Sequence, residues 1–233
     1  MKTLNCAAWT IGALCLALMS AQADELALEA ELAQEVEPAM VIAVPDDVDD
    51  AGGPAPNEPS NGRFVWAPGP PGTGGGDSGY ARFTIPIEEP GTYRLFGHIV
   101  AWDGNSDSFW VTIWQDGNND ADDDPNPQAS KDTNYRWALN PKGNNWVWDR
   151  VNHWLDGGTF DRAWELEKGL ATITIWARED ASMLDALFLT SDANAATGRL
   201  PTDEDRERQR NNFDLSVNPS GKLASAWASL KTR

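Results

Sequence analysis

The sequence predicts an all-β protein built from two antiparallel sheets, and two observations support this. Apolar and polar residues alternate with a period of two along several segments, the pattern of a strand with one face in a core. Gly, Pro, Asn and Asp separate these segments, as expected for short strands joined by turns. No segment of comparable length shows the 3.6-residue period of an amphipathic helix. The simplest arrangement is a two-sheet sandwich.

The first predicted strands lie near the N-terminus. Apolar residues alternate with Glu29 and Glu31 over 26–32 and predict a first strand, although the same residues also favour helix. Residues 39–44 form a second candidate strand. The acidic, Pro-rich and Gly-rich stretch 45–59 then predicts a long surface loop.

The central strands follow in close succession. Segments 81–87 and 93–99 alternate on either side of a Pro90-Gly91 turn, which is typical of consecutive antiparallel strands. Segment 109–114 alternates aliphatic or aromatic residues with Trp and Thr, and segment 172–176 does the same. Leu187 and Leu189 end the series.

Two charged segments interrupt or follow this pattern. Segment 116–131 is an acidic insertion with Asp or Asn at alternate positions, but Ala121 and Pro127 stand where an EF-hand loop needs Gly and Glu. We expect a solvated acidic loop here, with a looser cation site as the alternative. After Asp192 the strand pattern ends, and we expect 193–233 to be an irregular charged tail, peripheral or disordered.

Composition narrows the function classes. The 233 residues contain 36 Asp and Glu against 18 Lys and Arg, a net charge of −18, and this repels nucleic acid and anionic membrane surfaces. The length suits one domain plus tails. Two cysteines cannot form a four-thiolate zinc site.

The N-terminus resembles a secretory signal peptide. Lys2 precedes an apolar run of about 16 residues, shorter than the ~20 that a spanning helix needs, and Ala21-Gln22-Ala23 fits a cleavage site. We expect residues 1–23 to be removed, leaving a 24–192 domain without cysteine that is periplasmic or extracellular and not inserted in a membrane.

No constellation of residues specifies catalysis. Gly76-Asp77-Ser78-Gly79 imitates a serine protease nucleophile segment, but both histidines follow the serine, against the order of that triad. Acid pairs that suit a glycosidase are weak evidence among 36 acids.

Tryptophan is the informative residue type, with 12 in the chain. Trp66, Trp102 and Trp146 stand at predicted strand ends beside Pro, Gly, Asp and Asn. An indole at the rim of a loop suits the C–H face of a sugar ring, while neighbouring carboxylates and amides bind its hydroxyls. The alternative is that these rings lie at the edge of the core. The acidic charge favours neutral or cationic glycans.

An ordered series of motifs resembles the carbohydrate-binding modules of families 6 and 35 over about residues 29–192. The series comprises Glu29-Ala30-Glu31, Gly91-Thr92-Tyr93, Asn144-Asn145-Trp146-Val147-Trp148, Leu166-Glu167-Lys168-Gly169 and Leu184-Asp185-Ala186-Leu187. The resemblance implies a jelly-roll sandwich with a structural calcium ion on Glu29, Glu31 and Asp185.

The resemblance also implies a sugar site at the loop end of the sandwich. Phe64 or Trp66 would supply one aromatic side chain and Trp146 the other. We expect Asp107, Arg178 and Glu179 to orient the sugar, with a structural ion pair between Arg178 and Glu179 as the alternative. Met183 stands where the family often has an Asn that bonds sugar hydroxyls.

We therefore expect a secreted, non-catalytic, glycan-binding sandwich whose partners are polysaccharides or oligosaccharides and the enzymes that degrade them. Two alternatives stay open: a small jelly-roll polysaccharide lyase or glycoside hydrolase, and a structural or adhesive surface protein that binds no sugar.

Overall fold

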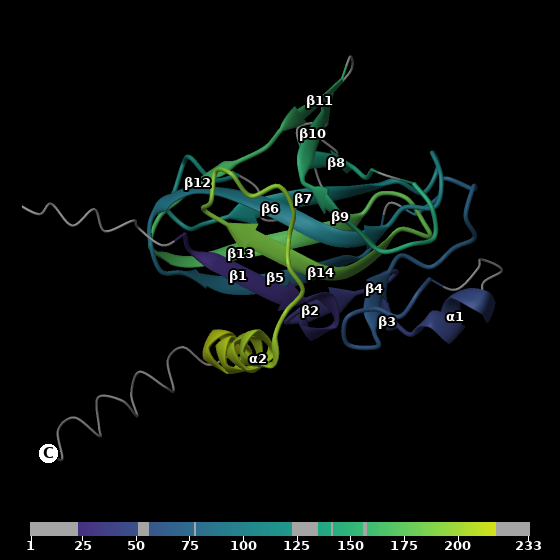
Figure 1. Ribbon diagram of the computed structural model, residues 1–233, viewed down its shortest axis with the longest axis horizontal. Helices are drawn as coiled ribbons and strands as arrows, with labels where there is room; N and C mark the ends of the chain where they lie inside the picture. The colour runs from purple at the N-terminus through teal and green to yellow at the C-terminus, as the bar shows by residue number, and fades with distance from the viewer. Residues whose placement is uncertain are drawn as a thin grey trace, which may run out of the picture.

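The computed structural model describes residues 23–50, 56–76, 78–122, 135–140, 142–155 and 158–217 (Figure 1). The strands are β1 (Glu25–Glu29), β2 (Glu35–Glu37), β3 (Val41–Ala43), β4 (Phe64–Trp66), β5 (Tyr80–Ile87), β6 (Gly91–Val100), β7 (Ser108–Trp114), β8 (Arg136–Ala138), β9 (Val147–Arg150), β10 (Asn152–Leu155), β11 (Gly158–Asp161), β12 (Trp164–Leu166), β13 (Gly169–Ala177) and β14 (Met183–Thr190). The helices are η1 (Ala30–Leu32, 3-10), α1 (Pro45–Asp50) and α2 (Asp203–Val217).

The strands form two antiparallel sheets that pack face to face, and this confirms the predicted all-β sandwich. The seven-stranded sheet has the order β12-β6-β14-β4-β3, with β1 also paired to β14 and β9 to β6. The five-stranded sheet has the order β2-β5-β13-β7-β8. Strands β10 and β11 form a separate two-stranded sheet beside β8, at the edge of the five-stranded sheet (Figure 1).

The period-two pattern places the core between the sheets. In β5 every second side chain is buried, and Phe83 and Ile85 pack with Ile173 and Ile175 of the neighbouring β13. The other sheet contributes Leu95, Leu184 and further apolar side chains to the same cluster. Burial of alternate apolar side chains therefore sets the register.

The N-terminal strand differs from the prediction. β1 ends at Glu29 and the chain continues as η1, so the strand pattern does not extend to Leu32. As a result Glu29 is completely buried and Glu31 is 9% exposed. Part of the predicted 45–59 loop is the short helix α1, whose Val48 is buried.

The segments after and between the sheets also carry structure. The described part of the 193–233 tail contains α2, and its Gln209 is only 3% exposed. Residues 1–22, most of the predicted signal peptide, lie outside the described residues, as do 123–131 of the acidic insertion. Among the described residues no helix is long and apolar enough to cross a membrane.

Candidate functional site

The three tryptophans predicted for the sugar site lie together at the loop end of the sandwich. Trp66 is 5% exposed and packs in a small cluster with Phe64, Val100 and Met183, against which the half-buried Trp102 and Trp146 also pack. These neighbours cover the Trp66 ring, so it has no free face for a sugar. Trp102 and Trp146 are covered in part.

The polar edges of two of these rings are already bonded. Trp102 Nε1 donates to the Ala181 carbonyl at 2.9 Å, and Trp146 Nε1 donates to the Asn57 carbonyl at 2.6 Å. Trp146 also stacks on His98 at 5.8 Å between ring centroids. These contacts hold both indoles against the main chain of neighbouring loops.

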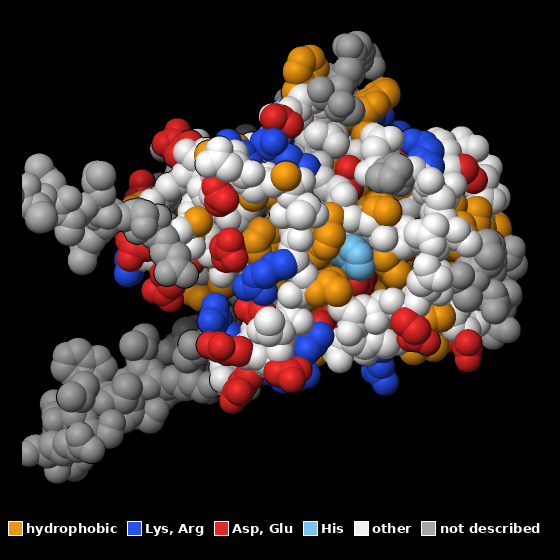
Figure 2. Space-filling view, viewed as in Figure 1, with side chains coloured by type: hydrophobic (Ala, Val, Ile, Leu, Met, Phe, Trp, Pro, Cys, Tyr) orange, Lys and Arg blue, Asp and Glu red, His pale blue; other side chains and the backbone are white. Residues whose placement is uncertain are grey.

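The outer face of the seven-stranded sheet continues this aromatic packing. His98 lies 5.0 Å from the Trp148 ring, and Trp148 contacts Phe188 edge-on at 6.5 Å between ring centroids. In Figure 2 hydrophobic side chains gather along the middle of this face, and charged side chains of both signs gather below them. The segment that leads to α2 covers part of the face, because a Cβ at Gly198 would meet the Trp148 ring at 2.4 Å.

The predicted polar residues of the sugar site lie together in a different place. Asp107 N donates to Glu179 Oε2 at 2.9 Å, and the Ser108 hydroxyl donates to the same oxygen at 2.6 Å. Arg178 is ion-paired with the other oxygen of Glu179. Lys142 Nζ lies 2.7 Å from Asp107 Oδ2. The ends of β7 and β13 bring these side chains together.

The two carboxyl groups of this cluster have pKa values shifted in opposite directions. Burial raises the pKa of Asp107, although the Lys142 ammonium works against that shift. Burial also acts on Glu179, but the Ser108 and Asp107 hydrogen bonds and the Arg178 charge outweigh it and lower its pKa. The hydrogen bonds that Glu179 accepts therefore favour its ionised form, whereas burial disfavours the ionised form of Asp107.

Asp107, Arg178 and Glu179 line a cleft of about 380 Å³. The remaining lining residues are Gly104, Ser108, Arg136, Ala138, Asn140, Lys142 and Trp154. The Arg136 guanidinium lies over the Trp154 ring, 3.2 Å from its centroid. The Trp154 indole, with one face covered by this guanidinium, thus lies beside a group of charged hydrogen-bonding side chains, which is the composition of a site for a polar ligand with an apolar face.

Trp154 reaches the cleft because its hairpin is attached to the edge of the five-stranded sheet. Asn152 Nδ2 donates to the Ala138 carbonyl at 2.9 Å, and Asn152 Oδ1 accepts from Ala138 N at 3.3 Å. The side chain of Asn152 therefore continues the hydrogen bonding of β8. Sequence reasoning missed Trp154, and its only signal was a Trp in a short strand beside polar residues.

A second hollow of about 330 Å³ shares Arg136, Arg178 and Glu179 with the first. Its far wall is the Gly74–Gly76 segment, and its base includes Trp110. Gly76 has a φ of +131°, and a Cβ there would meet Asp180 N at 2.8 Å. The Gly-rich segment 74–76 is thus explained by its close approach to the β13–β14 turn.

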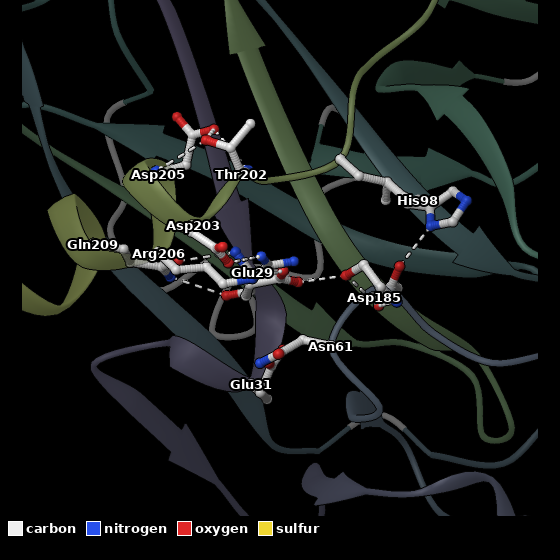
Figure 3. Close-up of polar contacts among 12 residues, drawn as sticks. Glu29, Glu31, Asn61, His98, Asp185, Thr202, Asp203, Asp205, Arg206 and Gln209 are labelled. Atoms are coloured by element: carbon white, nitrogen blue, oxygen red, sulfur yellow. Dashed lines mark hydrogen bonds and ion pairs between the residues drawn. The ribbon is translucent and has the colours of Figure 1, made fainter.

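The three carboxylates predicted to hold calcium also lie close together (Figure 3). The Ser60 hydroxyl donates to Glu29 Oε2 at 2.5 Å and to Asp185 Oδ1 at 3.0 Å, so it joins these two groups. Asn61 Nδ2 donates to Glu31 Oε1 at 2.6 Å. Burial raises the pKa of Glu29 to about 7, with smaller contributions from Glu31 and Asp185.

The donor set as arranged does not fit a calcium ion, which takes six to eight oxygen ligands. Glu29 Oε1 accepts from Arg206 at 2.8 Å, and Asp185 Oδ2 lies 2.6 Å from His98 Nδ1. Of the six carboxylate oxygens only Glu31 Oε2 is buried without a partner. Across the described ranges no group of three or more Cys, His, Asp or Glu side chains is placed to hold a metal ion.

The described part of the acidic insertion contains a structural contact. Asp122 Oδ1 lies 2.6 Å from Arg162, which is 3% exposed, and Asp122 Oδ2 accepts from Ile113 N and Trp164 Nε1, both at 2.7 Å. Asp122 is thus the partner of a buried cation. Asp116 and Asp120 are exposed.

Comparison with known proteins gives similarity to solved structures only. No family model and no curated protein matches the sequence. The C-terminal family 6 carbohydrate-binding module of LamC, a laminarinase from Zobellia galactanivorans, has a TM-score of 0.43 and 12% identity, covering 72% of this chain and 99% of that one. A family 35 carbohydrate-binding module from Clostridium thermocellum has a TM-score of 0.42 and 10% identity, covering 71% and 97%.

The GH26-CBM35 β-(1,4)-mannanase of Podospora anserina has a TM-score of 0.44 and 15% identity, covering 76% of this chain but 28% of the enzyme. These likenesses concern the course of the backbone, and at 10–15% identity residue roles and ligands do not transfer.

Proposed function

We propose that the protein is a non-catalytic glycan-binding sandwich whose sugar site is the cleft between Asp107, Trp154 and Glu179. The observation that carries the proposal is the position of an indole beside two carboxyl groups and three cationic side chains in one open cleft. This composition matches a pyranose ring, which has apolar C–H faces and a rim of hydroxyl groups.

The charges of the cleft nearly balance, and this suits an uncharged ligand. Lys142 is paired with Asp107 and Arg178 with Glu179, and the third cation, Arg136, lies over the Trp154 ring. Hydroxyl groups can donate to the carboxylates and accept from the cations without breaking either pair. Trp154 would provide the apolar wall. We therefore propose neutral sugars as ligands.

Binding explains the cleft better than hydrolysis does. The opposite pKa shifts of Asp107 and Glu179 resemble those of an acid–base pair. However, Glu179 contacts both the backbone and the side chain of Asp107, whereas a glycosidase holds its two carboxyl groups about 5–9 Å apart around the scissile bond. The pair leaves no room for such a bond between its members.

Affinity electrophoresis on a panel of soluble and insoluble neutral polysaccharides tests the proposal. Retardation of the wild-type protein that Glu179→Gln abolishes would support it, and Glu165→Gln is the matched control because Glu165 bonds Thr92 outside the cleft. Absence of retardation on every glycan would favour a structural or adhesive role. Release of reducing sugar or of unsaturated product would favour the lyase or hydrolase.

The proposal includes export, with residues 1–23 as the signal peptide. It also includes binding to polysaccharides together with the enzymes that degrade them. N-terminal sequencing of secreted protein that begins at Asp24 would test the first part. The proposal does not include the calcium ion predicted from the sequence, because protein groups bond five of the six carboxylate oxygens at its position.

A further inference from the structure

Helix α2 packs beside the carboxylate cluster, and its side chains Arg206 and Gln209 bond Glu29 (Figure 3). Gln209 is 3% exposed and bonds the main chain at the end of β1. Its Nε2 donates to the Glu29 carbonyl at 2.9 Å and to the Leu32 carbonyl at 3.1 Å, and its Oε1 accepts from Glu29 N at 2.9 Å. Gln209 therefore supplies hydrogen-bond partners to main-chain groups that a neighbouring strand or a longer helix would otherwise bond.

Arg206 brings a positive charge to the same place. Its Nε donates to Glu29 Oε1 at 2.8 Å, and its Nη1 donates to Asp203 Oδ1 at 2.8 Å. Glu29 is fully buried, whereas Asp203 is fully exposed. A buried carboxylate is costly without a partner, so the Glu29 contact is the one that matters for stability.

A second ion pair fixes the entry to the helix. Asp205 Oδ2 accepts from Thr202 N at 2.9 Å and from Arg199 Nη1 at 2.6 Å. These bonds lower the pKa of Asp205 to about 2, against the effect of its burial. The segment thus presents Arg206 and Gln209 to the cluster from a fixed backbone.

We propose that segment 199–210 is an intramolecular ligand of the Glu29, Glu31 and Asp185 cluster, with Arg206 in the place of a bound cation. The guanidinium neutralises Glu29. Ser60 bonds Glu29 Oε2, Asn61 bonds Glu31 Oε1, and His98 bonds Asp185. The chain ends are then held together by protein groups, and the sandwich is stable without a metal ion.

Thermal unfolding of the full chain in excess EDTA and in excess calcium chloride tests this. The wild-type Tm should be the same in both. Arg206→Met should lower the Tm in EDTA by roughly 5–10 °C because it leaves Glu29 buried without a cation. The matched control is Arg208→Met, which removes an exposed arginine whose ion-pair partner among the described residues is the exposed Glu204, and it should change the Tm little.

A double variant separates loss of charge balance from general damage to the helix. Arg206→Met with Glu29→Gln removes both charges, so its Tm should lie above that of Arg206→Met alone. If the single variant does not fold, folding of the double variant distinguishes loss of charge balance from general damage to the helix. A double variant no more stable than the single one would overturn the proposal.

Calcium titration of the wild-type protein by calorimetry provides the independent readout. We expect no stoichiometric binding. One calcium ion bound per chain, together with a higher Tm in calcium than in EDTA, would overturn the proposal and restore calcium as the cation of this site.

Discussion

Met183 lies directly opposite Trp66 in the antiparallel pair of β14 and β4, and both side chains are buried. An apolar side chain there lets Trp66 close against Phe64 and Val100. Met183 thus contributes to the packing that leaves the Trp66 ring 5% exposed.

Truncation of this packing should affect stability more than binding. We expect Trp66→Ala to lower the free energy of unfolding by about 3 kcal/mol, because it leaves a cavity in a buried cluster. Chemical denaturation measures the loss. The affinity for a glycan that the wild type binds should change less than about twofold. A larger loss of affinity would place sugar at Trp66.

The acidic insertion provides a matched pair of aspartates. Asp122→Ala should lower the free energy of unfolding by about 3 kcal/mol, because it leaves the guanidinium of Arg162 buried without its partner. Asp120→Ala removes an exposed carboxylate and should change stability by less than about 0.5 kcal/mol. Equal effects of the two substitutions in denaturant melts would argue against the Asp122–Arg162 contact.

Asp149 predicts a dependence of stability on pH. Burial raises its pKa from 3.8 to about 7, although Trp137 Nε1 donates to it at 2.7 Å. Between these two values the folded state holds a proton that the unfolded state has lost, so raising the pH removes stability. Other carboxylates contribute their own slopes, and a variant is needed to isolate this one.

Asp149→Asn is that variant, since it cannot ionise. Its stability relative to the wild type should rise by about 1–3 kcal/mol between pH 5 and pH 8. Parallel urea melts across this range measure the difference between the two proteins. A difference that stays constant with pH would mean that Asp149 keeps an ordinary pKa in the folded protein.

The fold could be predicted from the sequence because strand periodicity reports local burial. The alternation in 81–87 reappears as alternate buried side chains in β5, whereas in β13 the side chains of 173–177 are buried on both faces. The order of strands in the sheets could not be obtained in this way, since it depends on pairings between distant segments such as β1 and β14.

Of the residues that line the proposed cleft, sequence reasoning named only the polar ones Asp107, Arg178 and Glu179. Asp107, Arg178 and Glu179 converge as expected, but nothing in the sequence shows that the β10 hairpin brings Trp154 beside them. Helix α2 escaped prediction for a related reason. Its contact with the sandwich is made by Arg206 and Gln209, so it has no apolar stripe, and its charged residues resemble those of a solvated tail.

The most direct test compares two tryptophan variants on one glycan that retards the wild type. We predict that Trp154→Ala lowers the affinity at least about tenfold with little change in Tm, because Trp154 lines the open cleft. Trp146→Ala should instead lower the Tm and keep the affinity, because Trp146 packs on His98 and Phe64. Loss of affinity in Trp146→Ala with normal binding by Trp154→Ala would contradict the account.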